Sequence, residues 1–262
     1  MINAQKQTVL ITGATSGIGF ELAKIFAADS YNLVLIARRA DRLEKIKTEF
    51  EKNFGITVTN IVKNLSEQTA AQEIAEEIKK QEISIDILIN NAGIGVYGNF
   101  SNTEREKELN MIKLNITALT DLTKLLLGSM IQRRKGKILN VASTAAFQPG
   151  PKMAVYFASK AYVLSFSEAL REEVKQHGIT VCCLCPGTTR TEFQQIAATE
   201  GILGTLREDV MMDAKTVAQI AYKGLNKGKA IIIPGYKNKL LVVIERFVPR
   251  AIVRRIVAKM LN

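Results

Sequence analysis

The stretch T-V-L-I-T-G-A-T-S-G-I-G, Thr8 to Gly19, joins a short apolar run to a loop with three glycines, and a helix-like segment follows. Glycines at such positions permit a tight turn and a close approach of the backbone to a ligand. The N-terminus of the following helix offers free N–H groups and the positive end of its dipole. Because the loop follows a strand and opens a helix, it predicts a cradle for a pyrophosphate group.

The same order of a short apolar run and a longer amphipathic run continues along the chain. The apolar runs are almost continuous, which is typical of strands buried on both faces of a parallel sheet. The alternation predicts an α/β fold: a Rossmann-type, doubly wound sheet of about seven parallel strands with helices on both faces. The expected strands are Thr8–Thr12, Asn32–Ala37, Thr57–Val62, Ile85–Asn90, Lys137–Val141, Ile179–Cys185 and Ala230–Ile233.

The expected helices fill the intervals between these strands. With 262 residues, 47% of them apolar, and no linker rich in Pro, Gly or Ser, the chain is expected to form a single domain. Residues 1–235 are assigned to its main body, and residues 236–262 to a basic amphipathic extension of the same domain. The helix-like segments are Gly17–Asp29, Asp41–Asn53, Glu67–Gln81, Glu104–Arg134, Met153–His177 and Ala214–Lys227.

Ligands of such sheets bind at the carboxyl ends of the strands, so the residues that follow each strand are informative. An NAD-binding unit is expected to place Asp or Glu after the second strand, where it holds the ribose 2′-hydroxyl. Here Ala37 occupies that place, and Arg38 and Arg39 follow. Guanidinium groups suit a 2′-phosphate, which favours NADP(H) over NAD(H). The alternative is that both arginines are solvated loop residues.

Polar or glycine-rich residues also follow the other strands of the predicted sheet. Each group alone would more often be turn chemistry, but their gathering at one edge predicts a nucleotide site. These groups are Asn64 with Leu65, N-N-A-G (Asn90 to Gly93), Ser143, and P-G-T-T-R-T (Pro186 to Thr191).

The stretch Y-F-A-S-K, Tyr156 to Lys160, lies in a chain with a single histidine, His177. On a helix, residues i and i+4 share a face with Cβ atoms roughly 6 Å apart. An ammonium that close to a phenol is expected to lower the pKa of Tyr156, which would provide a proton donor near neutral pH. His177 precedes Gly178 at the end of a predicted helix, so we expect it to cap the helix or lie on the surface.

Taken together, these motifs resemble the short-chain dehydrogenase/reductase superfamily. The T-G-x-x-x-G-I-G loop, N-N-A-G, Asn115, Ser143 and Y-x-x-x-K come in the family's order and roughly its spacing. The arginine pair after the second strand resembles the NADP-preferring branch. The resemblance implies reversible hydride transfer between a nicotinamide cofactor and a carbonyl, and a homodimer or homotetramer.

The resemblance also implies a role for each catalytic residue. Ser143 would hold the substrate oxygen, Tyr156 would act as general acid or base, and Lys160 would lower the pKa of Tyr156 and bind the nicotinamide ribose. Asn115 would hold a water that links Lys160 to solvent. Asn64 departs from the family, which usually has Asp there. The expected cofactor contacts are Gly13, Thr15, Ser16, Gly17, Ile18, Gly19, Arg38, Arg39, Asn64, Leu65, Asn91, Ala92, Gly93, Tyr156, Lys160, Pro186, Gly187 and Thr191.

Residues from about 188 to 212 correspond to the family's variable substrate lid. Their large apolar side chains favour a partly apolar, acyl- or lipid-like carbonyl substrate, although these side chains could equally pack the lid onto the body. The alternative to an enzyme is an NADP(H)-binding regulatory or scaffold protein that keeps the fold without turnover. The apolar residues are Phe193, Ile196, Ile202 and Leu203.

The net charge of +11 is concentrated in the last part of the chain, where residues 236–262 carry seven basic residues and one acid. The pattern around Pro249 predicts two amphipathic helices broken at the proline. They could dock on the body or a subunit interface, or contact an anionic membrane surface. Nucleic acid is not expected, because interleaved aromatic residues are absent.

Cys182, Cys183 and Cys185 crowd into one apolar run, which predicts small fillers of a buried strand in a reducing cytosol. No cluster of His, Cys, Asp or Glu has metal-ligand spacing, so no metal is expected. No signal segment or membrane-spanning run is recognised. The sequence therefore predicts a cytoplasmic protein, with peripheral membrane contact left open.

Overall fold

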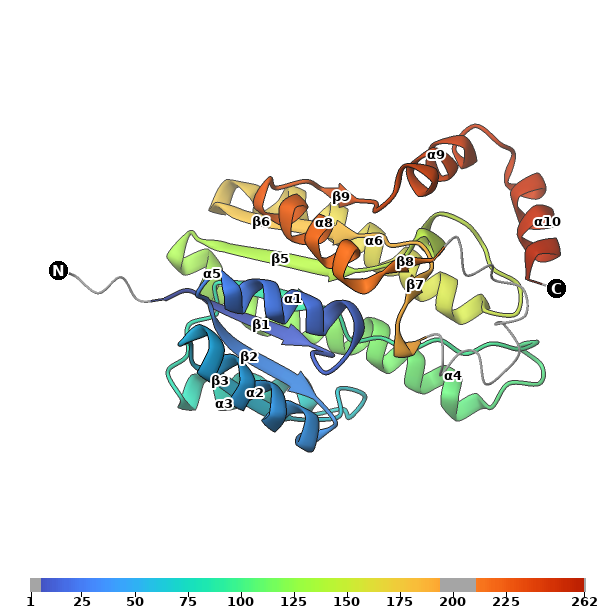
Figure 1. Ribbon diagram of the computed structural model, residues 1–262. Helices are drawn as coiled ribbons and strands as arrows, with labels where there is room; N and C mark the ends of the chain where they lie inside the picture. The colour runs from blue at the N-terminus through green and yellow to red at the C-terminus, as the bar shows by residue number, and fades with distance from the viewer. Residues whose placement is uncertain (1–5, 194–210, 262) are drawn as a thin grey trace.

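The computed structural model describes residues 6–193 and 211–261, which are built around a seven-stranded parallel sheet (Figure 1). The order β3-β2-β1-β4-β5-β6-β9 reverses direction between β1 and β4, as in a doubly wound fold. The predicted fold class is confirmed. The strands are β1 (Thr8–Thr12), β2 (Asn32–Ala37), β3 (Val58–Val62), β4 (Ile87–Asn90), β5 (Gly136–Val141), β6 (Ile179–Leu184) and β9 (Ile231–Ile232).

Helices cover both faces of the sheet because successive strand side chains point to opposite sides. In β1, Val9 and Ile11 pack with α1 (Gly17–Ala28), α2 (Ala40–Phe54) and α8 (Ala214–Asn226). Leu10 lies on the other face with α3, α5 and α6. The helical elements on that side are α3 (Ala70–Lys80), α4 (Arg105–Ile112), the π-helix η1 (Lys113–Ala118), α5 (Leu119–Arg133), α6 (Ala154–Val174) and the 3₁₀ helix η3 (Lys175–His177).

A buried polar network ties α5 and α6 to the centre of the sheet. Asn90 of β4 and Asn140 of β5 are register partners, and Asn90 Nδ2 donates to Asn140 Oδ1 at 2.9 Å. Asn90 Nδ2 also donates to Thr123 Oγ1 of α5, and Asn140 Nδ2 donates to Ser167 Oγ of α6, both at 2.9 Å. An unpaired buried amide would cost about 1–3 kcal/mol, so the network specifies how both helices sit on the sheet.

A short parallel ribbon was not expected from the sequence. In it, β7 (Thr189–Arg190) pairs with β8 (Met212–Asp213), so it joins the two ends of the expected lid. Two-residue strands carry no apolar run long enough to be recognised. Ile196, Ile202 and Leu203, which the sequence assigned to the lid, lie outside the described residues.

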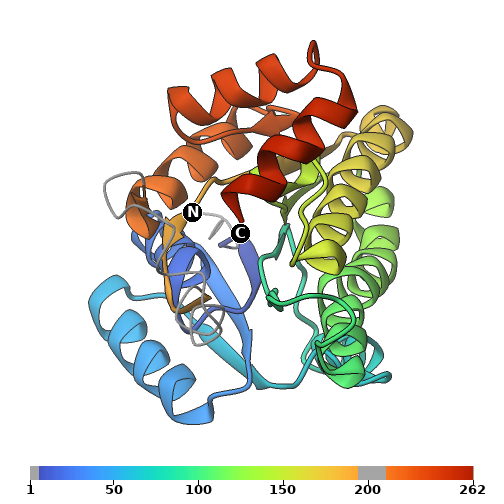
Figure 2. The ribbon, with the colours of Figure 1, turned by 90° about the vertical axis from the view of Figure 1, so that its right-hand side faces the viewer.

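The last segment forms two helices on either side of Pro249, as predicted: α9 (Tyr236–Glu245) and α10 (Arg250–Met260). Figure 2 views the molecule from the side to which the strands point, and α10 lies across that side. In the ranges that the structure describes, we find no helix long and apolar enough to span a membrane. The three cysteines are buried in and just after β6, as expected.

Candidate active site

The carboxyl edge of the sheet gathers the residues that the sequence assigned to the site, because parallel strands all end there. The loop after β1 and the start of α1 supply Gly13 to Gly19, and the segments after β2 to β6 supply the rest. The 3₁₀ helix η2 (Thr144–Phe147) and α6 bring Ser143, Tyr156 and Lys160 to the same edge. The predicted convergence at one edge is therefore observed.

The glycine loop is shaped so that side chains would not fit. Gly13 and Gly17 have φ angles of +67° and +56°, which favour glycine. A Cβ on Gly19 would lie 2.4 Å from both Asn91 Nδ2 and the Gly13 carbonyl oxygen. Asn91 Nδ2 donates to the carbonyl oxygens of Thr12 at 2.9 Å and of Gly13 at 3.1 Å. The structure thus gives the Asn91 amide a role in bracing the loop.

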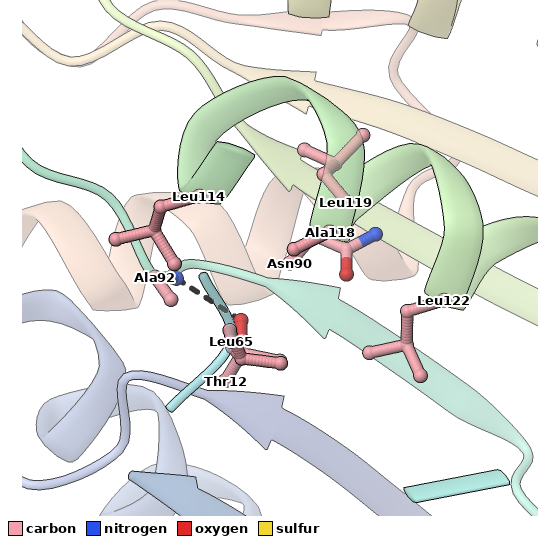
Figure 3. Close-up of a pocket in the computed structure, with 8 residues that line it drawn as sticks. All are labelled: Thr12, Leu65, Asn90, Ala92, Leu114, Ala118, Leu119 and Leu122. Atoms are coloured by element: carbon pink, nitrogen blue, oxygen red, sulfur yellow. Dashed lines mark hydrogen bonds between the residues drawn. The ribbon is translucent and has the colours of Figure 1, made fainter. Parts of the chain in front are cut away.

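Thr12 is a site residue that the sequence did not single out. Its hydroxyl accepts a hydrogen bond from the backbone N–H of Asn91 at 2.9 Å. It also accepts one from the backbone N–H of Ala92 at 3.0 Å, which is the dashed line in Figure 3. It thereby joins the end of β1 to the N-N-A-G turn. The only sequence signal was a threonine that ends a buried strand. Beside Thr12 lies a small cavity with a volume of about 10 Å³. It is lined by Thr12, Leu65, Asn90, Ala92, Leu114, Ala118, Leu119 and Leu122.

The arginine side of the site contains an acid that the sequence did not predict. Arg39 donates from Nη1 to Glu192 Oε2 at 2.8 Å and from Nη2 to Thr15 Oγ1 at 2.9 Å. Arg42 also pairs with Glu192, and hydrogen bonds from Arg42 and then Arg39 hold the pKa of that carboxyl below its usual value. Arg38 is exposed. Glu192 and Arg39 are 153 positions apart, so no local pattern could have linked them.

In the turn after β3, the side chain of Asn64 accepts a hydrogen bond from the backbone of the turn itself. Asn64 Oδ1 accepts from the backbone N–H of Ser66 at 3.2 Å, which is an Asx-type turn. Leu65 is buried beside it. The Asn64 side chain, which was expected to contact the cofactor, therefore already shapes the turn.

Ser143 is held by its own backbone neighbourhood after β5. It caps η2, with its Oγ accepting from the Ala145 N–H at 3.1 Å and donating to the Pro186 carbonyl at 3.4 Å. The Ser143 side chain is also within hydrogen-bonding reach of the Tyr156 phenol. The two hydroxyl groups therefore lie close together.

Tyr156 and Lys160 share a face of α6, with the ammonium 5.7 Å from the ring centroid. Burial raises the pKa of Tyr156 to about 12, although the hydrogen bond with Ser143 acts in the opposite direction. Burial also lowers the pKa of Lys160 to about 8. The expectation of a lowered pKa for Tyr156 is therefore wrong in this structure. That expectation considered a neighbouring charge and neglected desolvation, which disfavours both charged forms.

Asn115 lies in the π-helix between α4 and α5 and is buried. Its Oδ1 accepts from the Ile94 N–H at 3.0 Å, and its Nδ2 donates to the Ile94 carbonyl at 2.9 Å and to Ser159 Oγ at 3.0 Å. Ser159 Oγ in turn donates to the Tyr156 carbonyl at 2.7 Å. The Asn115 side chain thus connects the turn after β4 to the helix that carries the tyrosine. Sequence reasoning missed Ser159, which lies inside the Y-x-x-x-K motif.

Thr191 and Gly187 lie where the chain leaves β6. A Cβ on Gly17 would lie 2.9 Å from Thr191 Cγ2, so Thr191 packs on the glycine loop. A Cβ on Gly187 would lie 2.5 Å from Asn238 Nδ2, which places α9 against the loop after Pro186. Asn238 was not expected to reach this loop.

Comparison with known proteins agrees with this arrangement. The family model for short chain dehydrogenases matches residues 7–200. The chain belongs to the short-chain dehydrogenase family. A very-long-chain 3-oxoacyl-CoA reductase from Pyrenophora tritici-repentis is 31% identical over 233 residues, 87% of this chain and 67% of the relative. The human 17-beta-hydroxysteroid dehydrogenase type 3 is 36% identical over 216 residues, 80% of this chain and 67% of the relative.

The solved structures include a short-chain dehydrogenase from Sphingobium yanoikuyae in complex with NADPH. It matches this short-chain dehydrogenase with a TM-score of 0.83 at 32% identity, covering 92% of this chain and 94% of that chain. The chain spans about two thirds of the length of the two enzymes named above. Membership of the family, predicted from the motifs, is confirmed.

Tyr156 of this short-chain dehydrogenase lies beside an apolar wall. The rings of Tyr156 and Phe193 lie 5.5 Å apart, and a Cβ on Gly95 would come within 2.9 Å of Phe193 and 3.4 Å of Tyr156. Met153 and Phe157 continue the wall. Two positions of α10 pack on it as well: Val253 and Val257.

We predict that Gly19→Ala destabilises the protein, whereas Gly128→Ala stabilises it. The Gly19 methyl would overlap backbone and amide atoms, an overpacking that costs about 1–3 kcal/mol. Gly128 lies in α5 with open space around its Cβ position, so alanine gains about 0.5–1 kcal/mol of helix stability. Urea unfolding monitored by circular dichroism measures both, and equal effects of the two substitutions would contradict the tight loop.

Proposed function

We propose that the protein is an NADP(H)-dependent oxidoreductase that reduces the carbonyl group of a partly apolar substrate. The observation that carries the proposal is the convergence of Ser143, Tyr156 and Lys160 beside a glycine cradle at one edge of the sheet. The alternative, an NADP(H)-binding regulatory or scaffold protein, would use the same cradle without turnover.

The residues present fit a dinucleotide. The glycine loop leaves room that any side chain would fill, and the N-terminus of α1 follows it directly. Ser16 directly precedes α1, and its side chain makes no capping hydrogen bond, so its hydroxyl is available to a phosphate. Arg39 and Thr15 lie together where a ribose 2′-phosphate would be held. The bound nicotinamide would supply a hydride, and the NADPH complex of the Sphingobium enzyme supports this choice of cofactor.

The protein's own groups would polarise and protonate the carbonyl. The Ser143 hydroxyl, positioned by the hydrogen bond that it accepts from the Ala145 N–H, would turn its single proton from the Pro186 carbonyl to the substrate oxygen. Tyr156 would then give its phenolic proton to that oxygen as negative charge develops. Lys160, whose Nζ donates to the Val141 carbonyl at 3.0 Å, would hold the ribose and favour the charge that forms on Tyr156.

Asn115 is expected to hold a water between Lys160 and solvent, and it would do so through its backbone rather than its side chain. Both polar atoms of the side chain already have partners in Ile94 and Ser159. A π-helical turn changes the regular pattern of backbone hydrogen bonds, and such turns often occur at functional sites. We propose that a carbonyl in this turn holds the water that would connect Lys160 to solvent.

The raised pKa of Tyr156 favours reduction over oxidation at neutral pH. A phenol with a pKa of about 12 is protonated, which is the form that reduction requires. Oxidation requires the phenolate, which is rare at that pH. The apolar wall around Tyr156 and the similarity to acyl and steroid enzymes support an acyl- or lipid-like carbonyl as substrate.

We also propose a homodimer or homotetramer in the cytoplasm, formed through the outer sides of α5 and α6. Leu125 and Tyr162 are exposed there, and Tyr162 stacks on Phe166 with ring centroids 5.9 Å apart. An exposed apolar pair on neighbouring helices is a reasonable contact for a second copy.

Tyr156→Phe is expected to lower the rate of carbonyl reduction by about 10²–10⁴-fold, because it removes the proton donor and keeps the ring. NADPH binding, measured by fluorescence titration, should change little. The test is NADPH consumption over a panel of ketones and 3-oxoacyl thioesters. A wild-type protein that binds NADPH and turns over none of the panel would favour the regulatory alternative.

The pH profiles of the two directions should differ in shape. Reduction should be nearly constant up to about pH 7 and fall to about half near pH 8, as Lys160 loses its charge around its pKa of about 8. Oxidation should rise about tenfold per pH unit through neutral pH, because the phenolate fraction rises toward the pKa of about 12. Measuring kcat/KM in both directions tests this, and an oxidative profile without slope contradicts it. In Lys160→Arg, whose charge persists, the alkaline fall should disappear.

Substitutions of Arg39 and of Glu192 should change the preference for NADPH over NADH in opposite directions. Arg39→Ala removes a charged donor to the 2′-phosphate and should reduce the preference for NADPH over NADH by about tenfold or more. Glu192→Gln removes a carboxylate that occupies Arg39 and should increase that preference. Dissociation constants for both cofactors measure the effect, with Lys52→Ala at the far end of α2 as a charge-matched control. Equal losses of NADH and NADPH affinity in Arg39→Ala would argue against the 2′-phosphate site.

A further inference from the structure

The helices α9 and α10 present one face to the body and another to solvent. On the inner side of α9, Val242 is buried and Asn238 contacts the loop at Gly187. On the inner side of α10, Val253 and Val257 pack on the wall beside the catalytic tyrosine. The Tyr97 hydroxyl donates to the Leu261 carbonyl at 2.8 Å, which fastens the end of α10. The docking expected as one alternative for this segment is therefore observed.

The outer side of α9 is apolar and uncovered. Its exposed large side chains recur at the spacing of one helical face and continue into the turn before Pro249, where Phe247 is 83% exposed. Ile252 and Ile256 are exposed one turn apart on α10. Soluble monomers seldom expose so many neighbouring apolar side chains, and such patches mark interaction sites. The residues of the α9 patch are Tyr236, Leu240, Leu241, Val243, Ile244 and Phe247.

The charges around this patch are of one sign. Lys237, Lys239 and Arg246 are exposed on α9 and in the turn that follows, and the seven-residue spacing of Lys239 and Arg246 places both along one border of the apolar stripe. The two helices and their ends carry seven basic residues, and the single acid, Glu245, is only partly exposed and has a pKa raised by burial. An apolar stripe bordered by Lys and Arg is the pattern of a helix that lies in the surface of an anionic bilayer.

We propose that α9 and the turn before Pro249 dock on an anionic lipid bilayer, with the apolar patch inserted among the headgroups. A second copy of the chain would bring like charges together, which disfavours self-association on this face. Because the inner side of α10 packs beside Tyr156, docking would hold the catalytic end of the sheet against the membrane. An apolar substrate could then reach the site from the bilayer. The docking does not depend on the proposed reaction.

The test is co-sedimentation of the full-length protein with large vesicles of phosphatidylcholine, alone or with about one third phosphatidylserine. We expect binding to the anionic vesicles that weakens strongly between about 0.1 and 0.5 M NaCl. Leu240→Ser/Phe247→Ser and, separately, Lys239→Gln/Arg246→Gln should each weaken binding by at least about tenfold. The matched controls are Val62→Ser, on the opposite edge strand of the sheet, and Lys45→Gln/Lys52→Gln, on α2. Both should bind like the wild type.

Failure to bind anionic vesicles at low salt would overturn the proposal, as would binding that neither pair of substitutions weakens. A dimer that Leu240→Ser/Phe247→Ser dissociates, without vesicle binding by the wild type, would assign the patch to a second copy instead. The double variant should reduce a water-soluble ketone at the wild-type rate. That measurement separates a failure of membrane docking from a failure of the proposed chemistry.

Discussion

Parallel strands end together, and the backbone and side-chain groups at that edge must find hydrogen-bond partners away from the sheet. In this protein asparagine side chains meet much of that need. Asn90 and Asn140 connect the strands to α5 and α6, Asn91 holds the glycine loop, and Asn115 joins the turn after β4 to α6. An amide suits this task because it donates and accepts at once. The geometry of the glycine loop and the position of α6 both depend on these contacts.

Burial also determines the protonation states of the side chains in the site. Burial shifts Tyr156 and Lys160 toward their neutral forms, because both charged forms lose solvation. The tyrosine is thereby kept protonated, and the lysine titrates close to physiological pH. A surface pair with the same spacing on an exposed helix would show neither effect. The reactivity therefore comes from the surroundings of the motif as much as from the motif.

The sequence was sufficient for the fold because buried parallel strands need continuous apolar runs. The predicted and observed strand boundaries differ where a residue is buried but lies outside the paired strand. Ile85 is buried, for example, but β4 begins at Ile87. The glycine loop was also predictable, since its positive φ angles require glycine, and the shared face of Tyr156 and Lys160 followed from their helical spacing. Contacts between distant segments were not predictable, such as Glu192 with Arg39 or Asn238 with Gly187. The direction of the pKa shift at Tyr156 was missed for the same reason, because desolvation depends on the whole fold.

Val253 and Val257 pack near Tyr156 from α10, a helix that follows the last strand of the sheet. Changes at these two positions would alter the shape beside the reactive group while leaving strand pairing and the nucleotide cradle intact. During divergence, such a helix offers a route to new selectivity with little risk to folding. Paralogues could thus exchange or remodel this one segment and keep the rest of the fold unchanged.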